Sequence, residues 1–128
     1  MRLLIAKDRS VENVQQEFNS LYPFLKLEFY KLNNDDADLQ VKRHLPHSTM
    51  LTAAGLRNSG DIEVSDEMTV AQLEKTFRKQ FGLDAQVCRK SGILWLQTTM
   101  TDNWSLQKQN EHGREISLTA KTFPGFEG

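Results

Sequence analysis

Cysteine is almost missing from this sequence, which has one, Cys88, in 128 residues. A single thiol excludes a framework of disulfides within the chain and fits a reducing compartment, so we expect a cytoplasmic protein. Reactive thiols need an electropositive and accessible setting, whereas buried thiols behave as small apolar side chains. We expect the second behaviour for Cys88, which falls in a strand-like stretch.

Long apolar runs and an excess of charge of one sign are also missing. The N-terminal stretch MRLLIAKDRS has too short an apolar run for a signal peptide, and no stretch could span a membrane. Sixteen basic and seventeen acidic residues give a formal net charge of −1, so no global field attracts the chain to nucleic acid or anionic lipid. Because 38% of the residues are hydrophobic, including seven Phe, we expect one core and a single domain over residues 1–128.

Signatures of catalysis and of metal binding are missing as well. The chain contains no CxxC, HExxH, nucleophile elbow or glycine-rich phosphate loop. His44 and His47 lie close in the sequence and His112 lies elsewhere, but a closed zinc site needs four ligands. The acidic run at 33–38 lacks the glycine and the final glutamate of an EF-hand loop. We therefore expect no catalytic residue, no cofactor and no metal ion, and we favour a role other than catalysis.

The most regular part of the sequence, residues 69–104, begins with a helix. Thr69 and Gln72 form a capping-box pattern, which fixes the start of the helix. Apolar residues then recur at spacings of three and four, as in the buried stripe of an amphipathic helix: Val70, Leu73, Phe77 and Phe81. Gly82 follows the stripe, where a left-handed conformation commonly ends a helix.

A hairpin follows this helix. Residues 85–89 alternate in polarity, residues 90–92 supply turn chemistry, and residues 93–99 are rich in strand-forming residues. In the second strand, Ile93 and Trp95 point to one face and Leu94 and Leu96 point to the other, so a single layer cannot cover both sets.

Two elements could cover the second face of this strand. A short helix at 103–111, which carries Trp104 and ends at Gly113, could close it within the chain. A second copy of the chain could instead close it across a two-fold interface. The helix offers only Trp104 and Leu106 as apolar cover, so we favour a homodimer.

The first thirty residues repeat the pattern of a capped helix followed by a strand. Ser10 is a cap, a helical stripe follows it, and residues 25–29 alternate with the period of a half-buried strand. The two caps are separated by 69 − 10 = 59 residues, and at this offset the helix stripes coincide. Duplication and two helices built to one physical rule both explain the match.

The order of these elements predicts an α+β fold. We expect one sheet of four to six strands with two main helices on one face, in the split βαβ (ferredoxin-like) arrangement, plus a C-terminal hairpin and short helix. The expected parts are strand-helix-strand at 1–31, an irregular connection at 32–60, strand-helix-hairpin at 61–100, and a short helix and tail at 101–128. Ile116 and Leu118 could add a last strand. The expected core residues are Phe18, Phe29, Leu73, Phe77 and Val87.

Two strings of this sequence are similar to those of short uncharacterised bacterial α+β proteins: YPFLKLEFY at 22–30 and RKSGILWLQTTMTDNWSLQKQNEHG at 89–113. The resemblance covers most of the chain apart from the middle connection. It implies no activity, cofactor or site residue.

These patterns lead to two hypotheses of function. The first is a non-catalytic cytoplasmic interaction module that self-associates, because apolar strand positions need covering and no reaction chemistry is visible. The alternative is a domain that binds nucleic acid or a small ligand through aromatic residues of the sheet, although the charge and the missing RNA-binding signature disfavour nucleic acid. The candidate binding or interface residues are Tyr30, Arg89, Lys90, Leu94, Trp95, Leu96 and Trp104.

Overall fold

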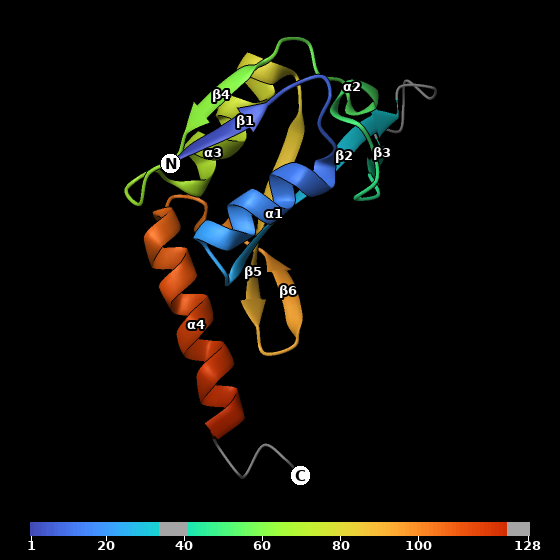
Figure 1. Cartoon of the computed structure of the whole chain (residues 1–128). Helices are drawn as coiled ribbons and strands as arrows, with labels where there is room; N and C mark the ends of the chain where they lie inside the picture. The colour runs from blue at the N-terminus through green and yellow to red at the C-terminus, as the bar shows by residue number, and fades with distance from the viewer. Residues whose placement is uncertain (34–40, 123–128) are drawn as a thin grey trace.

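The computed structural model describes residues 1–33 and 41–122, which form an α+β fold (Figure 1). The α-helices are α1 (Val11–Leu21), α2 (Leu51–Ala54), α3 (Val70–Thr76) and α4 (Leu106–Thr122). The strands are β1 (Arg2–Ile5), β2 (Leu25–Asn33), β3 (Val41–His44), β4 (Gly60–Glu63), β5 (Asp84–Ser91) and β6 (Leu94–Gln97). A π-helical turn, Phe77–Phe81, continues α3, and a 3-10 turn, Thr99–Thr101, follows β6.

The strands form two antiparallel sheets, which corrects the prediction of a single sheet in the split βαβ arrangement. β1 pairs with β4, and the other sheet has the order β3-β2-β5-β6. β2 lies between β3 and β5, and the part of β2 that β3 does not pair with is bonded by α1 instead of by β1. Gln15 and Asn19 of α1 donate side-chain hydrogen bonds to the carbonyl groups of Leu27 (2.8 Å) and Leu25 (2.9 Å).

The predicted helix starts are confirmed at both caps. Ser10 begins α1 and Thr69 begins α3, and each forms a reciprocal capping box, with Asn13 and Gln72 respectively. These side chains satisfy amide groups that have no partner within the helix. Gly82 ends the helical run with a φ of 72°, a conformation that favours glycine.

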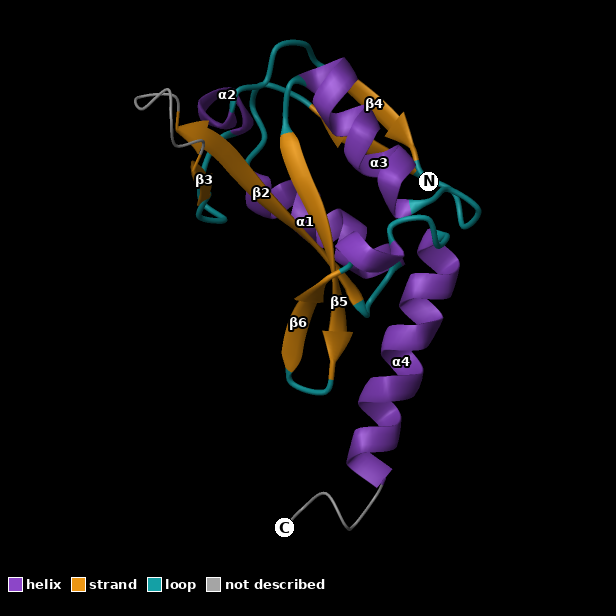
Figure 2. Ribbon diagram, turned by 180° about the vertical axis from the view of Figure 1, so that it is seen from behind, coloured by secondary structure: helices purple, strands orange, loops and turns teal. Residues whose placement is uncertain are grey.

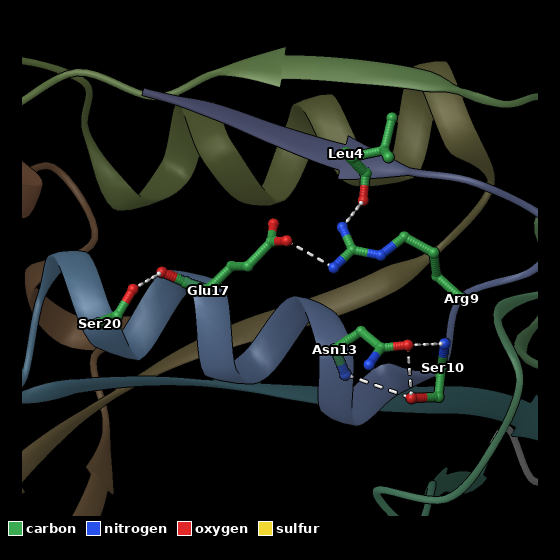
Figure 3. A network of polar contacts seen from close by, with 6 residues as sticks. All are labelled: Leu4, Arg9, Ser10, Asn13, Glu17 and Ser20. Carbon is green, nitrogen blue, oxygen red and sulfur yellow. Dashed lines mark hydrogen bonds and ion pairs between the residues drawn. The ribbon is translucent and has the colours of Figure 1, made fainter.

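Arg9 ties the two-stranded sheet to α1. Its guanidinium donates to the backbone oxygen of Leu4 in β1 and to the carboxylate of Glu17 in α1 (Figure 3). Because the Arg9 side chain is mostly buried, these charge-assisted bonds hold β1 against the first two turns of the helix.

One core joins both sheets and the helices α1 and α3. All five residues that the sequence assigned to the core are buried: Phe18, Phe29, Leu73, Phe77 and Val87. The rings of Phe29 in β2 and Phe77 after α3 meet edge to face, with centroids 5.5 Å apart. The same cluster includes Leu3 of β1 and Ile62 of β4, so side chains of the small sheet are buried in the same core as those of the larger sheet.

The resemblance between the two helices extends to two whole units, β1-α1-β2-β3-α2 and β4-α3-β5-β6-α4. Ser10 forms an isolated bridge with Met50 at the start of α2, and Thr69 forms the equivalent bridge with Ser105 before α4. The first amides of the helices donate to matching loop carbonyls: Val11 to Thr49, Val70 to Trp104, Leu51 to Arg9 and Leu106 to Met68. The sheet order is therefore the same from either end, and β3 and β6 are its equivalent edge strands.

Two parts of the chain differ from the predicted organisation. The connection at 32–60 contains the short helix α2 and also β3, and the low apolar periodicity of the connection did not reveal this strand. The helix predicted at 103–111 begins at Leu106 and continues to Thr122, so Ile116 and Leu118 lie in a helix instead of a strand. The acidic segment 34–40 and the tail 123–128 lie outside the described residues.

Gly113 does not end this helix but allows it to approach the hairpin closely. After Leu106, which is part of the core, the buried residues of α4 are small or polar: Gln109, Gly113 and Ser117. A β-carbon at Gly113 would lie 2.9 Å from Cγ of Arg89 and 3.2 Å from the backbone oxygen of Lys90. None of the described helices is long and apolar enough to cross a membrane.

Replacing Gly113 with alanine should destabilise the fold, although alanine is the better helix former by about 1 kcal/mol. The added methyl group would also lie 3.1 Å from Cβ of Phe24, so α4 must move away from the sheet. We expect a net loss of about 1 to 3 kcal/mol in the free energy of unfolding, measured by urea denaturation.

Glu115→Ala is the matched control, because Glu115 lies on the exposed face of the same helix. Its effect should stay within about 0.5 kcal/mol. A Gly113→Ala protein as stable as the parent would show that α4 does not depend on this close approach.

Candidate interaction surface

β6 is the second arm of a hairpin whose turn depends on Gly92. The two strands are joined at Ser91 and Leu94, which face each other, and Gly92 has a φ of 67°. Glycine is favoured at the first position of a two-residue type II′ turn, which needs a positive φ there. The predicted hairpin is thus confirmed, with its turn at Gly92 and Ile93.

β6 is an edge strand, and its side chains are exposed. It pairs with β5 on one side and is the last strand of its sheet on the other (Figure 2). Leu94 is 61% exposed, Trp95 37% and Leu96 44%. Of the ten large hydrophobic side chains that are exposed in the described part of the chain, half lie in β6 or in the turns on either side of it: Ile93, Leu94, Trp95, Leu96 and Met100. We call these five residues the β6 patch.

Of the two covers considered for this strand, the helix carrying Trp104 leaves the strand exposed. The Trp104 ring instead packs against cations and an imidazole: it lies 4.3 Å from Nζ of Lys108 and meets His112 edge to face. α4 packs on β5, where Ser117 accepts a hydrogen bond from the Gly92 amide (3.2 Å). Leu94 and Leu96 remain exposed beside α4.

The structure separates the predicted binding residues onto two faces of the sheet. Lys90 and Trp95 are directly opposite each other and share one face, and Tyr30 joins them there through a hydrogen bond from Gln97 (3.4 Å). Arg89 lies on the other face, opposite Leu96, where its guanidinium donates to Gln109 (2.8 Å) and lies over the Trp104 ring. Arg89 is therefore engaged within the chain.

A groove that the sequence did not reveal leads along α1 to Trp95. Its floor is formed by Lys26 and Glu28 of β2, and its wall by polar residues of α1, including Gln15 and Gln16. Nζ of Lys26 lies 5.8 Å from the Trp95 ring and 2.7 Å from the Glu28 carboxylate. The alternation of β2 places Lys26 and Glu28 on its polar face, but Trp95 is too distant in the sequence for its contact with Lys26 to be foreseen.

Glu28 is the most buried charged side chain of this groove, with 13% of its side chain exposed. Burial alone would raise its pKa, because it removes the carboxylate from water. Hydrogen bonds from Lys26 and His44 outweigh that effect and hold the pKa of Glu28 below its ordinary value of 4.5.

The histidines and the cysteine do not form a reactive or metal-binding centre in the described residues. His44 contacts Glu28, whereas Nδ1 of His47 lies 3.4 Å from Glu12. No three His, Cys, Asp or Glu side chains of residues 1–33 and 41–122 lie together as metal ligands would. Cys88 is buried, and burial raises the pKa of its thiol to about 11, so this thiol is protonated at neutral pH.

Replacing Glu28 with glutamine should reduce stability at neutral pH and have less effect in acid. The pKa of Glu28 is lower in the folded protein than in the unfolded chain, so its ionised form stabilises the fold above the unfolded pKa. This contribution is lost as the pH falls through the lowered folded pKa. The difference in unfolding free energy between parent and variant, measured in urea, should therefore shrink from about pH 6 to pH 3.

Glu74→Gln is a control for which the stability difference should change with pH in the opposite direction. Burial raises the pKa of Glu74, although its carboxylate accepts a hydrogen bond from the Val87 amide. The parent should therefore lose stability relative to Glu74→Gln as the pH rises through that raised pKa. If both differences change with pH in the same direction, these electrostatic assignments are wrong.

Comparison with known proteins adds no function to this surface. No family model, no curated protein and no solved structure matches the chain. Its role must be inferred from the residues described above.

Proposed function

We propose that this protein is a non-catalytic interaction module that self-associates through the β6 patch. The observation that carries this proposal is the concentration of exposed apolar side chains on one edge strand and its adjoining turns. These side chains are exposed on both faces of β6, and its open edge offers backbone groups to another chain, which makes such a strand a typical site of association.

The other edge of the same sheet supports this proposal by contrast. β3 is the equivalent edge strand, and it carries three consecutive basic residues, Lys42, Arg43 and His44. Charged residues on an edge strand are a common defence against pairing with another chain. β6 consists of Leu, Trp, Leu and Gln, so it lacks this defence.

Self-association should be visible as a concentration-dependent dimer of the full chain. We expect light scattering after size exclusion, at micromolar protein, to give twice the monomer mass. Leu94→Lys should weaken association at least tenfold, about 1.4 kcal/mol, because it places a charge within an apolar interface. Circular dichroism should show that this variant remains folded, since Leu94 makes no contribution to the core.

Leu4→Lys is the matched control. Leu4 is 51% exposed on β1, in the other sheet, so a lysine there should leave the dimer unchanged. A parent protein that stays monomeric as its concentration is raised would contradict self-association.

Binding of nucleic acid is the alternative, because Tyr30, Lys90 and Trp95 share one face of the sheet. We expect single-stranded oligonucleotides to leave the tryptophan fluorescence unchanged at low and at moderate salt. The net charge is −1, and the nearby Arg89 is already bound by Gln109. A fluorescence change that weakens steeply as salt is added would favour the alternative, since phosphate binding depends on counterion release.

A further inference from the structure

We infer that the partner of β6 is β6 of a second copy, paired antiparallel about a two-fold axis that brings Leu96 opposite the partner's Leu96. This inference rests on the proposed self-association and adds which strand pairs with which and in what register. The resulting sheet would continue through both copies without a break, with the two β3 strands at its ends.

The hairpin determines which backbone groups of β6 are free. In a hairpin with a two-residue turn, Ser91 and Leu94 form a hydrogen-bonded pair, and bonded and non-bonded pairs then alternate. Arg89 and Leu96 form the next bonded pair, and the amide of Thr98 donates to the Val87 carbonyl (3.3 Å), as this alternation requires. The amide and carbonyl groups of Trp95 and Gln97 therefore point away from β5, toward the open edge.

These free groups are complementary to themselves. An antiparallel pairing centred on Leu96 places Trp95 opposite the partner's Gln97 and Gln97 opposite the partner's Trp95, so all four residues use their free amides and carbonyls. Centring the pair on Trp95 would bring Ile93 of the turn into the ladder, and centring it on Gln97 would bring in Thr99 of the 3-10 turn. The Leu96 register is the one that forms its bonded pairs within the regular strand.

The side chains fit the same register. Leu94 and Leu96 lie on one face of β6. Across the axis Leu96 meets the partner's Leu96 directly, and Leu94, opposite the partner's Thr98, is the diagonal neighbour of the partner's Leu96. β6 has no charged residue, so its self-pairing sets no like charges against each other, whereas the pairing of two β3 strands would place basic residues opposite basic residues.

Pairing β6 with the partner's β3 would leave a free edge on each copy and form an open chain of molecules. Pairing β6 with the partner's β6 uses both open edges and forms a closed dimer.

Cysteine trapping tests this register in the full chain. In a non-bonded antiparallel pair the two Cα atoms lie about 4.5 Å apart, which a disulfide can bridge. We therefore expect Leu96→Cys, treated with a mild oxidant at micromolar concentration, to form a covalent dimer on a non-reducing gel. Leu94→Cys is the matched control on the same face. Residue 94 lies opposite the partner's Thr98, so residues 94 of the two copies are four positions apart along the strand, about 13 Å at roughly 3.3 Å per residue. It should not form the dimer, and the parent with its buried Cys88 should not either.

A measurement on the parent protein covers the case in which the cysteine itself weakens association. Hydrogen exchange at the amides of Trp95 and Gln97 should slow at least tenfold between dilute and concentrated protein, because both amides become bonded only in the dimer. If light scattering shows a dimer while Leu94→Cys crosslinks as readily as Leu96→Cys, or these amides stay unprotected, the register is overturned and self-association stands. If light scattering shows only a monomer, the proposed self-association itself fails.

Discussion

The antiparallel pairing of β2 with β5 is the constraint on which the rest of the structure depends. It joins the two consecutive units of the chain. Leu27 lies opposite Val87 and Phe29 lies opposite Ala85 on the core side of the sheet. Because each helix packs on the strand of its own unit, this ladder also brings α1 and α3 together over one core. The edge strands β3 and β6 follow as the outer arms of two hairpins, and their exposure is a consequence of that central pairing.

Equivalent helix positions of the two units bond to the backbone of the neighbouring strand with different side chains. Gln15 of α1 donates to the carbonyl of Leu27, and Glu74, which is 74 − 15 = 59 residues later, accepts from the amide of Val87. Both side chains satisfy the backbone of a strand next to their helix, once with an amide and once with a carboxylate. The carboxylate carries a cost that the amide does not, since burial disfavours its charged form and raises its pKa.

Sequence periodicity predicted the parts of this fold that bury apolar stripes. The capped helices, the hairpin and core residues such as Phe77 followed from spacings that only a helix or a strand would use. β3 was missed because Lys-Arg-His has no apolar alternation, and the length of α4 was missed because Gly113 has the usual mark of a helix end. Beyond Leu106, the buried residues of α4 are small or polar because the helix approaches β5 and Phe24 closely, so hydrophobic periodicity could not detect them.

The candidate surface was predictable only in part, for a related reason. A strand that is apolar on both faces, as around Trp95, indicates that something must cover it, but the sequence does not say whether the cover lies in the same chain. That question depends on where α4 packs, and its position follows from contacts of Gly113 and Ser117 with residues about 25 positions earlier in the chain. Once α4 is placed on β5, the two edges of the sheet differ in a simple way. One edge carries charge that discourages pairing, and the other carries leucines and free amides, which is the chemistry that a strand needs to bind its own copy.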